Sequence, residues 1–419
     1  MSATHPADET AILSEVPVTS LPLVWLGLVR KRLSQGELGV LPVVLGLVLI
    51  AIVFQALNSH FVEPLNVTNL MSQIAAMGTI AVGVVFVLLL GEIDLSVGWT
   101  SGFAAAVMAV LNVHYGVSAV VAVIAATLTG TVIGLFQGTW FSKLHVPAFV
   151  VTLAGYIGLQ GGLLYVLGNS GTINLNDPFL GDIANRLVPV ALGWAIAAAL
   201  VALYAASNLR TYWRRTRAGL LVGPFVGVVA RIILVAGGVA AAVAYMSVDR
   251  SSGVIPVQGV PTGVLLFVGI VITMDLVVRR TRFGRQVLAV GGNIEAARRA
   301  GIAVDRVRIA VFALASTLAA VGGILAASRL YAVNQNSGGG DVLLDSIAAA
   351  VIGGTSLFGG RGRPRNALLG ALVIGAIANG MDLLALSSAV KYMITGGVLL
   401  LAVTIDAAAR RGREASGRA

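Results

Sequence analysis

Long apolar runs separated by short polar segments make up most of this chain. Each run is about 20 residues long, which is the length of α-helix that crosses a bilayer. Since backbone polar groups in lipid must be hydrogen-bonded within the protein, we expect these runs to be helical. The pattern predicts an all-α, polytopic transmembrane helical bundle of about ten to twelve spans. The runs lie near residues 40–57, 70–90, 95–111, 117–137, 148–167, 187–206, 220–245, 260–278, 309–327, 366–385 and 389–405.

The charges between the runs predict the topology. Loops with few or no basic residues, at 58–69 and 168–186, are typical of the outside. Basic segments are typical of the cytoplasmic side, and the richest of them, 279–308, holds eight arginines. Both chain ends are then cytoplasmic. We therefore divide the chain into a tail with an interfacial segment (1–39), a transmembrane domain (40–406) and a second tail (407–419).

Composition excludes several classes of protein. The chain is 57% hydrophobic and 11% charged, whereas a soluble domain carries about 25% charged residues. The net charge of +10 lies in short segments between apolar runs, so we expect no nucleic-acid partner. There is no cysteine, and the four histidines are far apart in sequence. We expect no disulfide, metal site or cofactor.

The stretch from Gly91 to Gly98, Gly-Glu-Ile-Asp-Leu-Ser-Val-Gly, places two carboxylates between two apolar runs. An acid at the centre of a membrane helix costs about 2.5 kcal/mol or more, so Glu92 and Asp94 are candidate functional residues. The glycines and Ser96 predict a discontinuous helix, which a membrane tolerates only where protein or a water-filled cavity surrounds it. The sequence does not fix the depth of this break.

Two interpretations of this stretch remain open. Asp94 either accepts hydrogen bonds from Ser96 and nearby backbone groups, stabilising the break, or lines a path and offers acceptors to the hydroxyl groups of a sugar. Trp99, which follows closely, either stacks on a sugar face or packs within the bundle.

The basic segment 279–308 contains a predicted short helix. Asn293 is a suitable N-cap, Glu295 complements the positive end of the helix dipole, and Gly301 can end the helix in left-handed geometry. So short a helix is unstable alone, so the membrane domain or a partner must hold it. A second glycine-rich stretch, 353–362, follows an apolar piece, and its glycines include Gly353, Gly354, Gly359 and Gly360.

These motifs together resemble the permease subunits of bacterial sugar importers of the ATP-binding-cassette type, the ribose, xylose, arabinose and galactose group. The octapeptide resembles the family signature, in which a glycine is usual at the position of Glu92. Glu92 and the additional apolar region around 210–259 point to the D-xylose branch. Glu295, Ala296, Ala297 and Gly301 resemble the loop through which such permeases dock their ATPase, although a basic loop also satisfies the positive-inside rule alone. The stretch 353–362 resembles a second signature.

The resemblance implies a monosaccharide permease that works by alternating access in the bacterial inner membrane. It implies a permease homodimer, a cytoplasmic ATPase subunit and a periplasmic sugar-binding protein. The chain itself has no phosphate-binding loop, and none of its three lysines fits one, so we expect no enzyme activity here. An ion-coupled secondary sugar transporter, or an intramembrane enzyme using Glu92 and Asp94, are the alternatives.

Overall fold

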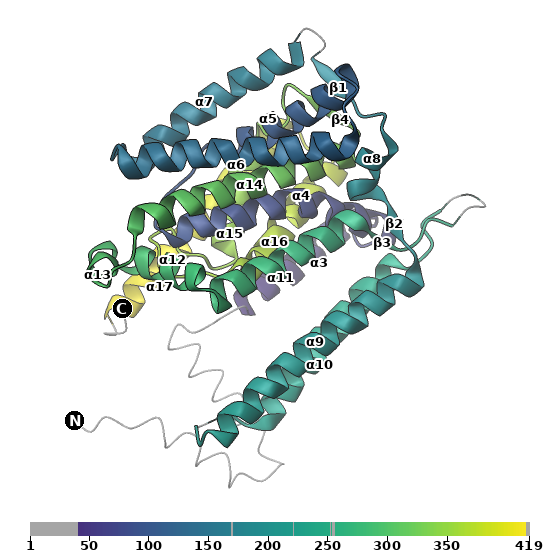
Figure 1. Ribbon diagram of the computed structural model, residues 1–419. Coiled ribbons are helices and arrows are strands. Elements are labelled where there is room, and N and C mark those ends of the chain that lie inside the picture. The colour runs from purple at the N-terminus through teal and green to yellow at the C-terminus, as the bar shows by residue number, and fades with distance from the viewer. Residues whose placement is uncertain (1–40, 169–170, 221, 252, 254–255, 416–419) are drawn as a thin grey trace. The chain divides into compact units, whose positions relative to one another are not determined.

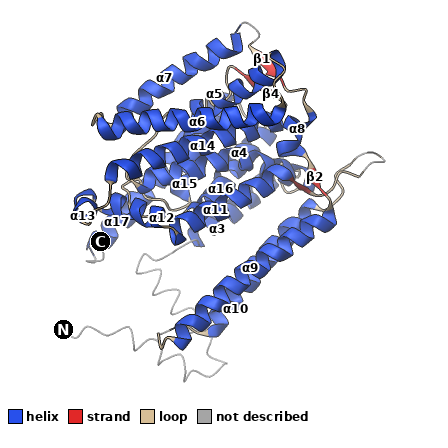
Figure 2. Ribbon diagram, in the orientation of Figure 1, coloured by secondary structure: helices blue, strands red, loops and turns tan. Residues whose placement is uncertain are grey.

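The computed structural model describes residues 41–168, 171–220, 222–251, 253 and 256–415. Its elements are almost all helices, with four strands of two or three residues, as Figure 2 shows. The predicted all-α helical bundle is therefore confirmed. The tail and interfacial segment predicted for residues 1–39 lie outside the described residues. At the other end, α17 (Ser388–Ala415) extends through most of the predicted tail at 407–419.

The chain divides into two compact units. The larger unit comprises Pro42–Val188 and Val260–Ala408. The smaller includes Pro189–Gly259, where α9 (Val190–Arg217) and α10 (Phe225–Met246) form a helical hairpin. Described by itself, this hairpin is the additional apolar region that the sequence singles out.

The larger unit is a bundle of membrane-length and shorter helices (Figure 1). In the described chain, nine helices are long and apolar enough to span a membrane, two of them in the hairpin; α3, α15 and α17 are not among the nine. The helices of the larger unit are α3 (Leu41–Leu57), α4 (Pro64–Leu89), α5 (Val97–Ala109), α6 (Ala119–Lys143), α7 (Ala148–Leu167), α8 (Pro178–Asn185), α11 (Thr262–Arg280), α12 (Arg282–Gly292), α13 (Ile294–Arg299), α14 (Val304–Leu330), α15 (Val342–Ile352), α16 (Pro364–Leu383) and α17. A π-helical turn, Val110–His114, continues α5.

Helix α14 forms the centre of the bundle and packs against α4, α5 and α6. Small residues allow the close approach. A Cβ atom on Gly134 of α6 would lie 2.3 Å from the carbonyl oxygen of Phe312 in α14, so a side chain there would push the helices apart. Membrane helices associate through such small-residue contacts, because lipid supplies no hydrophobic drive between them.

Two small antiparallel sheets connect loops at the bundle end opposite α13 (Figure 1). Strand β1 (Thr172–Asn174) pairs with β4 (Ala332–Asn334), with Thr172 opposite Asn334. Strand β2 (Leu187–Val188) pairs with β3 (Val260–Pro261). These pairings join the segment before the hairpin to the segment after it.

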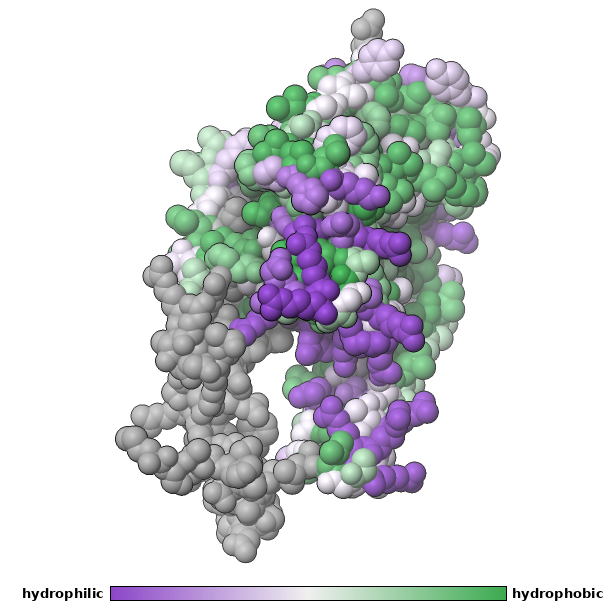
Figure 3. Space-filling view, turned by 60° about the vertical axis from the view of Figure 1, so that its left-hand side comes forward, coloured by the Kyte–Doolittle hydropathy of each residue, from purple (hydrophilic) through white to green (hydrophobic). Residues whose placement is uncertain are grey.

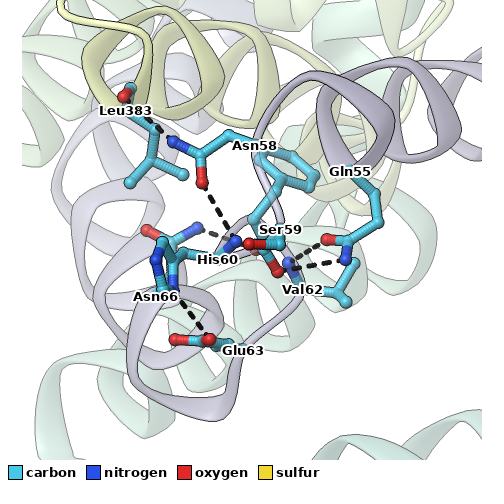
Figure 4. Close-up of polar contacts among 9 residues, drawn as sticks. Gln55, Asn58, Ser59, His60, Val62, Glu63, Asn66 and Leu383 are labelled. Carbon is cyan, nitrogen blue, oxygen red and sulfur yellow. Dashed lines mark hydrogen bonds and ion pairs between the residues drawn. The ribbon is translucent and has the colours of Figure 1, made fainter.

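The turn between α3 and α4 is held by side-chain amides, as Figure 4 shows. Asn58 donates to the carbonyl of Leu383 at the end of α16, at 3.1 Å. Asn66 and Asn379 exchange two amide hydrogen bonds, at 2.7 and 3.0 Å. Because each amide satisfies the other, the pair stabilises the contact between α4 and α16 without leaving a polar group unpaired.

Candidate functional site

The octapeptide Gly91–Gly98 interrupts the bundle as predicted, since α4 ends at Leu89 and α5 begins at Val97. Glu92 contacts Arg308 near the start of α14. Nine residues later the backbone of Ser101 lies against Gly323, where a Cβ would be 2.0 Å from the Ser101 carbonyl oxygen. These two points on α14 are fifteen residues apart, or about 22 Å of helix. The chain therefore turns at the bundle end and re-enters the bundle before α5 starts.

Asp94 lies inside this re-entrant turn and is 4% exposed. Its Oδ1 accepts hydrogen bonds from the backbone N–H of Ser96 at 2.8 Å and from the Ser96 hydroxyl at 2.7 Å. The amide of Gln137 in α6 donates to the same hydroxyl at 3.0 Å. Asp94 thus has the contacts of a residue that stabilises the break. Within the described residues, its buried Oδ2 has no hydrogen-bond partner.

Trp99 is packed inside the bundle rather than exposed to an open path. The residue is 5% exposed, and its ring lies edge-on to that of Tyr156 of α7, with centroids 5.9 Å apart. A Cβ on Gly339 would lie 2.7 Å from the indole, so the glycine-rich loop after β4 covers this ring. In this conformation a sugar could reach Trp99 only if that loop moved.

The predicted capped helix is present as α13. Asn293 accepts a hydrogen bond from the Ala296 N–H at 2.9 Å, and Gly301 has a φ of 78°. Glu295 pairs with Arg298 at 3.3 Å on the exposed face, and both side chains are largely exposed. Ala297, which is 4% exposed, anchors the helix to the bundle. The helix is held by packing, as its short length requires.

The segment 279–308 contains a second helix that was not predicted from the sequence. Helix α12 lies directly before α13, and the hydroxyl of Thr281 caps it by accepting the Gly284 N–H at 3.0 Å. Val287 and Val290 are buried. Thr281, followed by apolar residues on one helix face, is a sequence signal for this helix. The many arginines of the segment make that apolar pattern hard to recognise.

The octapeptide, α12 and the second signature meet at one place. The Gly360 N–H donates to the carbonyl of Leu89 at 2.9 Å. A Cβ on Gly291 would lie 1.7 Å from the same carbonyl oxygen, and one on Gly359 would lie 2.7 Å from the Gly291 carbonyl oxygen. We call this three-way contact of Leu89, Gly91, Gly291, Gly359 and Gly360 the glycine junction. Its backbone-to-backbone packing explains why glycine is used there.

The other two glycines of the second signature lie elsewhere. A Cβ on Gly353 would lie 2.3 Å from the carbonyl oxygen of Asn366, so this residue packs on α16. Gly354 has a φ of 91°, a conformation that favours glycine. These two residues end α15 and turn the chain rather than contact the octapeptide.

An ion pair reinforces the glycine junction. Oε1 of Glu92 lies 3.4 Å from the guanidinium of Arg308, and the two side chains are 22% and 14% exposed. The guanidinium also lies over the ring of Phe141, 4.6 Å from its centroid. Partial removal from water strengthens both contacts. In the sequence, Arg308 is not distinguishable from the other arginines of the segment 279–308.

Hydrophilic side chains gather at the end of the larger unit that carries α12 and α13, as Figure 3 shows. Arginines dominate this region of the sequence. No group of three or more His, Asp or Glu residues placed to hold a metal ion occurs in the described part of the chain. The site thus offers backbone contacts, one partly buried ion pair and a basic surface.

The nine apolar helices of the described residues are those of a multi-pass membrane protein. Residues 66–403 match the family model described as branched-chain amino acid transport system / permease component, and the chain belongs to this permease family. This confirms the family resemblance that the octapeptide and the segment 279–308 indicated.

Several curated proteins are similar over most of their length. The xylose transport system permease protein XylH of Escherichia coli K12 is 36% identical over 84% of this chain and 88% of its own. XylH of Haemophilus influenzae is 34% identical over 86% of this chain and 93% of its own. The ribose import permease protein RbsC of Bacillus subtilis is 34% identical over 90% of this chain and 96% of its own. No solved structure matches.

Proposed function

We propose that this chain is the permease subunit of an ATP-binding-cassette importer that carries a monosaccharide, D-xylose, across the bacterial inner membrane. The glycine junction is the observation that carries the proposal. It joins the basic segment, where a motor can dock, to the re-entrant turn inside the bundle. The relatives named for xylose and ribose support a pentose, and the extra hairpin α9–α10 and Glu92 favour xylose.

In this proposal a separate ATPase docks on α13 through Asn293, Glu295, Ala296, Ala297 and Gly301. Only Ala297 is buried among them, so the exposed face is free for a partner. Movement of α13 passes to the start of α14, where Arg308 holds Glu92. The glycine junction passes the same movement to the octapeptide, because its backbones are in direct contact.

The translocation path runs beside the re-entrant turn. Asp94 and Ser96 stabilise the turn, and their displacement opens polar acceptors toward the sugar. Transit requires weak hydrogen bonds that exchange quickly, since tight binding would slow release. Trp99 enters the path when the loop over it moves, and its ring face then stacks on the sugar.

The remaining partners follow from the same model. A periplasmic sugar-binding protein docks at the end that carries the β1–β4 sheet, and two permease copies form a homodimer around the path. Both chain ends are cytoplasmic in this proposal, and Arg410, Arg411 and Arg413 near the end of α17 support this location for the C-terminus. Reporter fusions at each end test this topology.

Uptake of labelled sugars by the reconstituted complex tests the substrate. We expect unlabelled xylose to compete best for uptake, ahead of ribose and galactose. Uptake of ribose that xylose does not affect would reject the xylose assignment and leave the permease function standing. Transport driven by an ion gradient without any ATPase would instead support a secondary transporter.

A further inference from the structure

The C-terminal end of α9 carries a concentration of positive charge that no acidic residue of the two hairpin helices compensates. Residues 190–246, which form both helices of the hairpin, contain five arginines and no aspartate or glutamate. Four of the five lie within the last two turns of α9, and all four are exposed. No ion pair within the hairpin helices can therefore neutralise Arg210, Arg214, Arg215 and Arg217.

Three of these arginines share one helix face. At about 100° per residue, positions 210, 214 and 217 fall within about 60° of one another, whereas Arg215 points about 140° away from Arg210. Arg210, Arg214 and Arg217 line one surface pocket together with Trp213. We call these three arginines the arginine face.

Aromatic packing fixes the position of Trp213 at the end of the hairpin. The ring of Tyr212 lies 5.3 Å from that of Phe225 at the start of α10 and 6.2 Å from that of Trp213. Tryptophan and tyrosine are enriched where a membrane helix meets the polar headgroups. Beyond this level α9 and α10 are mainly apolar, apart from the exposed Arg231 of α10. Large exposed apolar side chains along them include Leu192, Leu203, Val226, Ile233 and Leu234.

We propose that the arginine face binds the phosphate of an anionic phospholipid, whose acyl chains lie along the apolar hairpin. Guanidinium groups match phosphate oxygens with paired hydrogen bonds. The uncompensated charge selects an anionic headgroup, and the apolar surface that continues from it selects a lipid over a soluble anion. The assignment to the inner leaflet rests on the proposed topology.

Quenching of Trp213 fluorescence by brominated lipids tests this site in the full-length protein. The protein is reconstituted with increasing brominated phosphatidylglycerol or brominated phosphatidylcholine. A Trp213→Phe variant subtracts the signal of the other four tryptophans. We expect the anionic lipid to quench at a several-fold lower mole fraction than the neutral one, and 0.5 M salt to reduce this preference.

Two neighbouring substitutions with the same charge change form the matched pair. Arg214→Gln should reduce the preference for phosphatidylglycerol about fivefold, while Arg215→Gln should leave it nearly unchanged. Both residues are exposed, so unchanged melting temperatures will show that both variants fold.

Four outcomes would overturn the proposal. An equal loss of the preference for phosphatidylglycerol in both variants would mean that net charge alone attracts the lipid. Equal quenching by the two lipids would mean that the site does not select an anionic headgroup. Displacement of the brominated lipid by inorganic phosphate would identify a site for a free anion. Loss of quenching when the ATPase subunit is added would identify a protein as the occupant. None of these results bears on sugar transport, which the uptake assay tests separately.

Discussion

Glu92 and Arg308 form an ion pair between the re-entrant turn and α14, the helix that follows α13. Their closest atoms are 3.4 Å apart, and both side chains are mostly buried. The two residues are 216 positions apart in sequence, yet the glycine junction brings their segments together. This contact is therefore a direct route by which movement of α13 can reach the re-entrant turn.

Removing either partner of this pair should weaken both stability and transport. In Glu92→Gln the partly buried guanidinium of Arg308 loses its charged partner. We expect the free energy of unfolding to fall by about 1–3 kcal/mol. ATP-driven uptake should fall more than ATP hydrolysis. Glu63→Gln is the control, because the His60–Glu63 pair is exposed and such pairs contribute little. Equal uptake by both variants would remove the proposed role of the pair.

The glycine junction supplies a test in two adjacent positions. A Cβ on Gly291 would lie 1.7 Å from the carbonyl oxygen of Leu89, while one on Gly292 has no atom outside its local helix within 4 Å. We expect Gly291→Ala to lower stability by about 1–3 kcal/mol through overpacking. Gly292→Ala should be neutral or slightly stabilising. Thermal unfolding in detergent measures both, and similar melting temperatures would contradict the close contact.

Charge reversal on α13 should uncouple ATP hydrolysis from sugar uptake. Glu295→Arg removes an exposed pair with Arg298, which contributes only about 0.3–0.5 kcal/mol, so the fold should persist. We expect ATP hydrolysis to continue while uptake falls. Asp305→Arg, which makes the same change in the first turn of α14, should retain coupling. Normal uptake by Glu295→Arg would exclude α13 as the docking element.

Asp94 should prove more important as a hydrogen-bond acceptor than as a charge. Asp94→Asn keeps the Oδ1 that accepts from Ser96, so we expect the stability to change by less than about 1 kcal/mol. Asp94→Ala leaves the buried N–H of Ser96 without its acceptor and should cost about 1–3 kcal/mol. Melting temperatures of the two variants distinguish these cases, and an equal loss in both would show that the charge itself is required.

The sequence predicts the helices well because membrane spans depend on length and apolar composition, which are local properties. The capped helix at Asn293 is also local, so its cap and its glycine end were predictable. The meeting of Gly291, Gly359 and Leu89 was not, because the three segments are distant in sequence and only packing unites them. For the same reason Gln137 and Phe141 of α6 could not be assigned to the site. The sequence did single out the additional apolar region around 210–259, but not the packing of α9 and α10 into a hairpin.

The most direct test uses proteoliposomes containing the chain, with labelled xylose and sugar-binding protein on one side. We predict that uptake occurs only when the separate ATPase and ATP are present on the other side, and that it continues after all ion gradients are collapsed. Xylose accumulation by the chain without the ATPase would contradict the proposal that its energy comes from a docked motor.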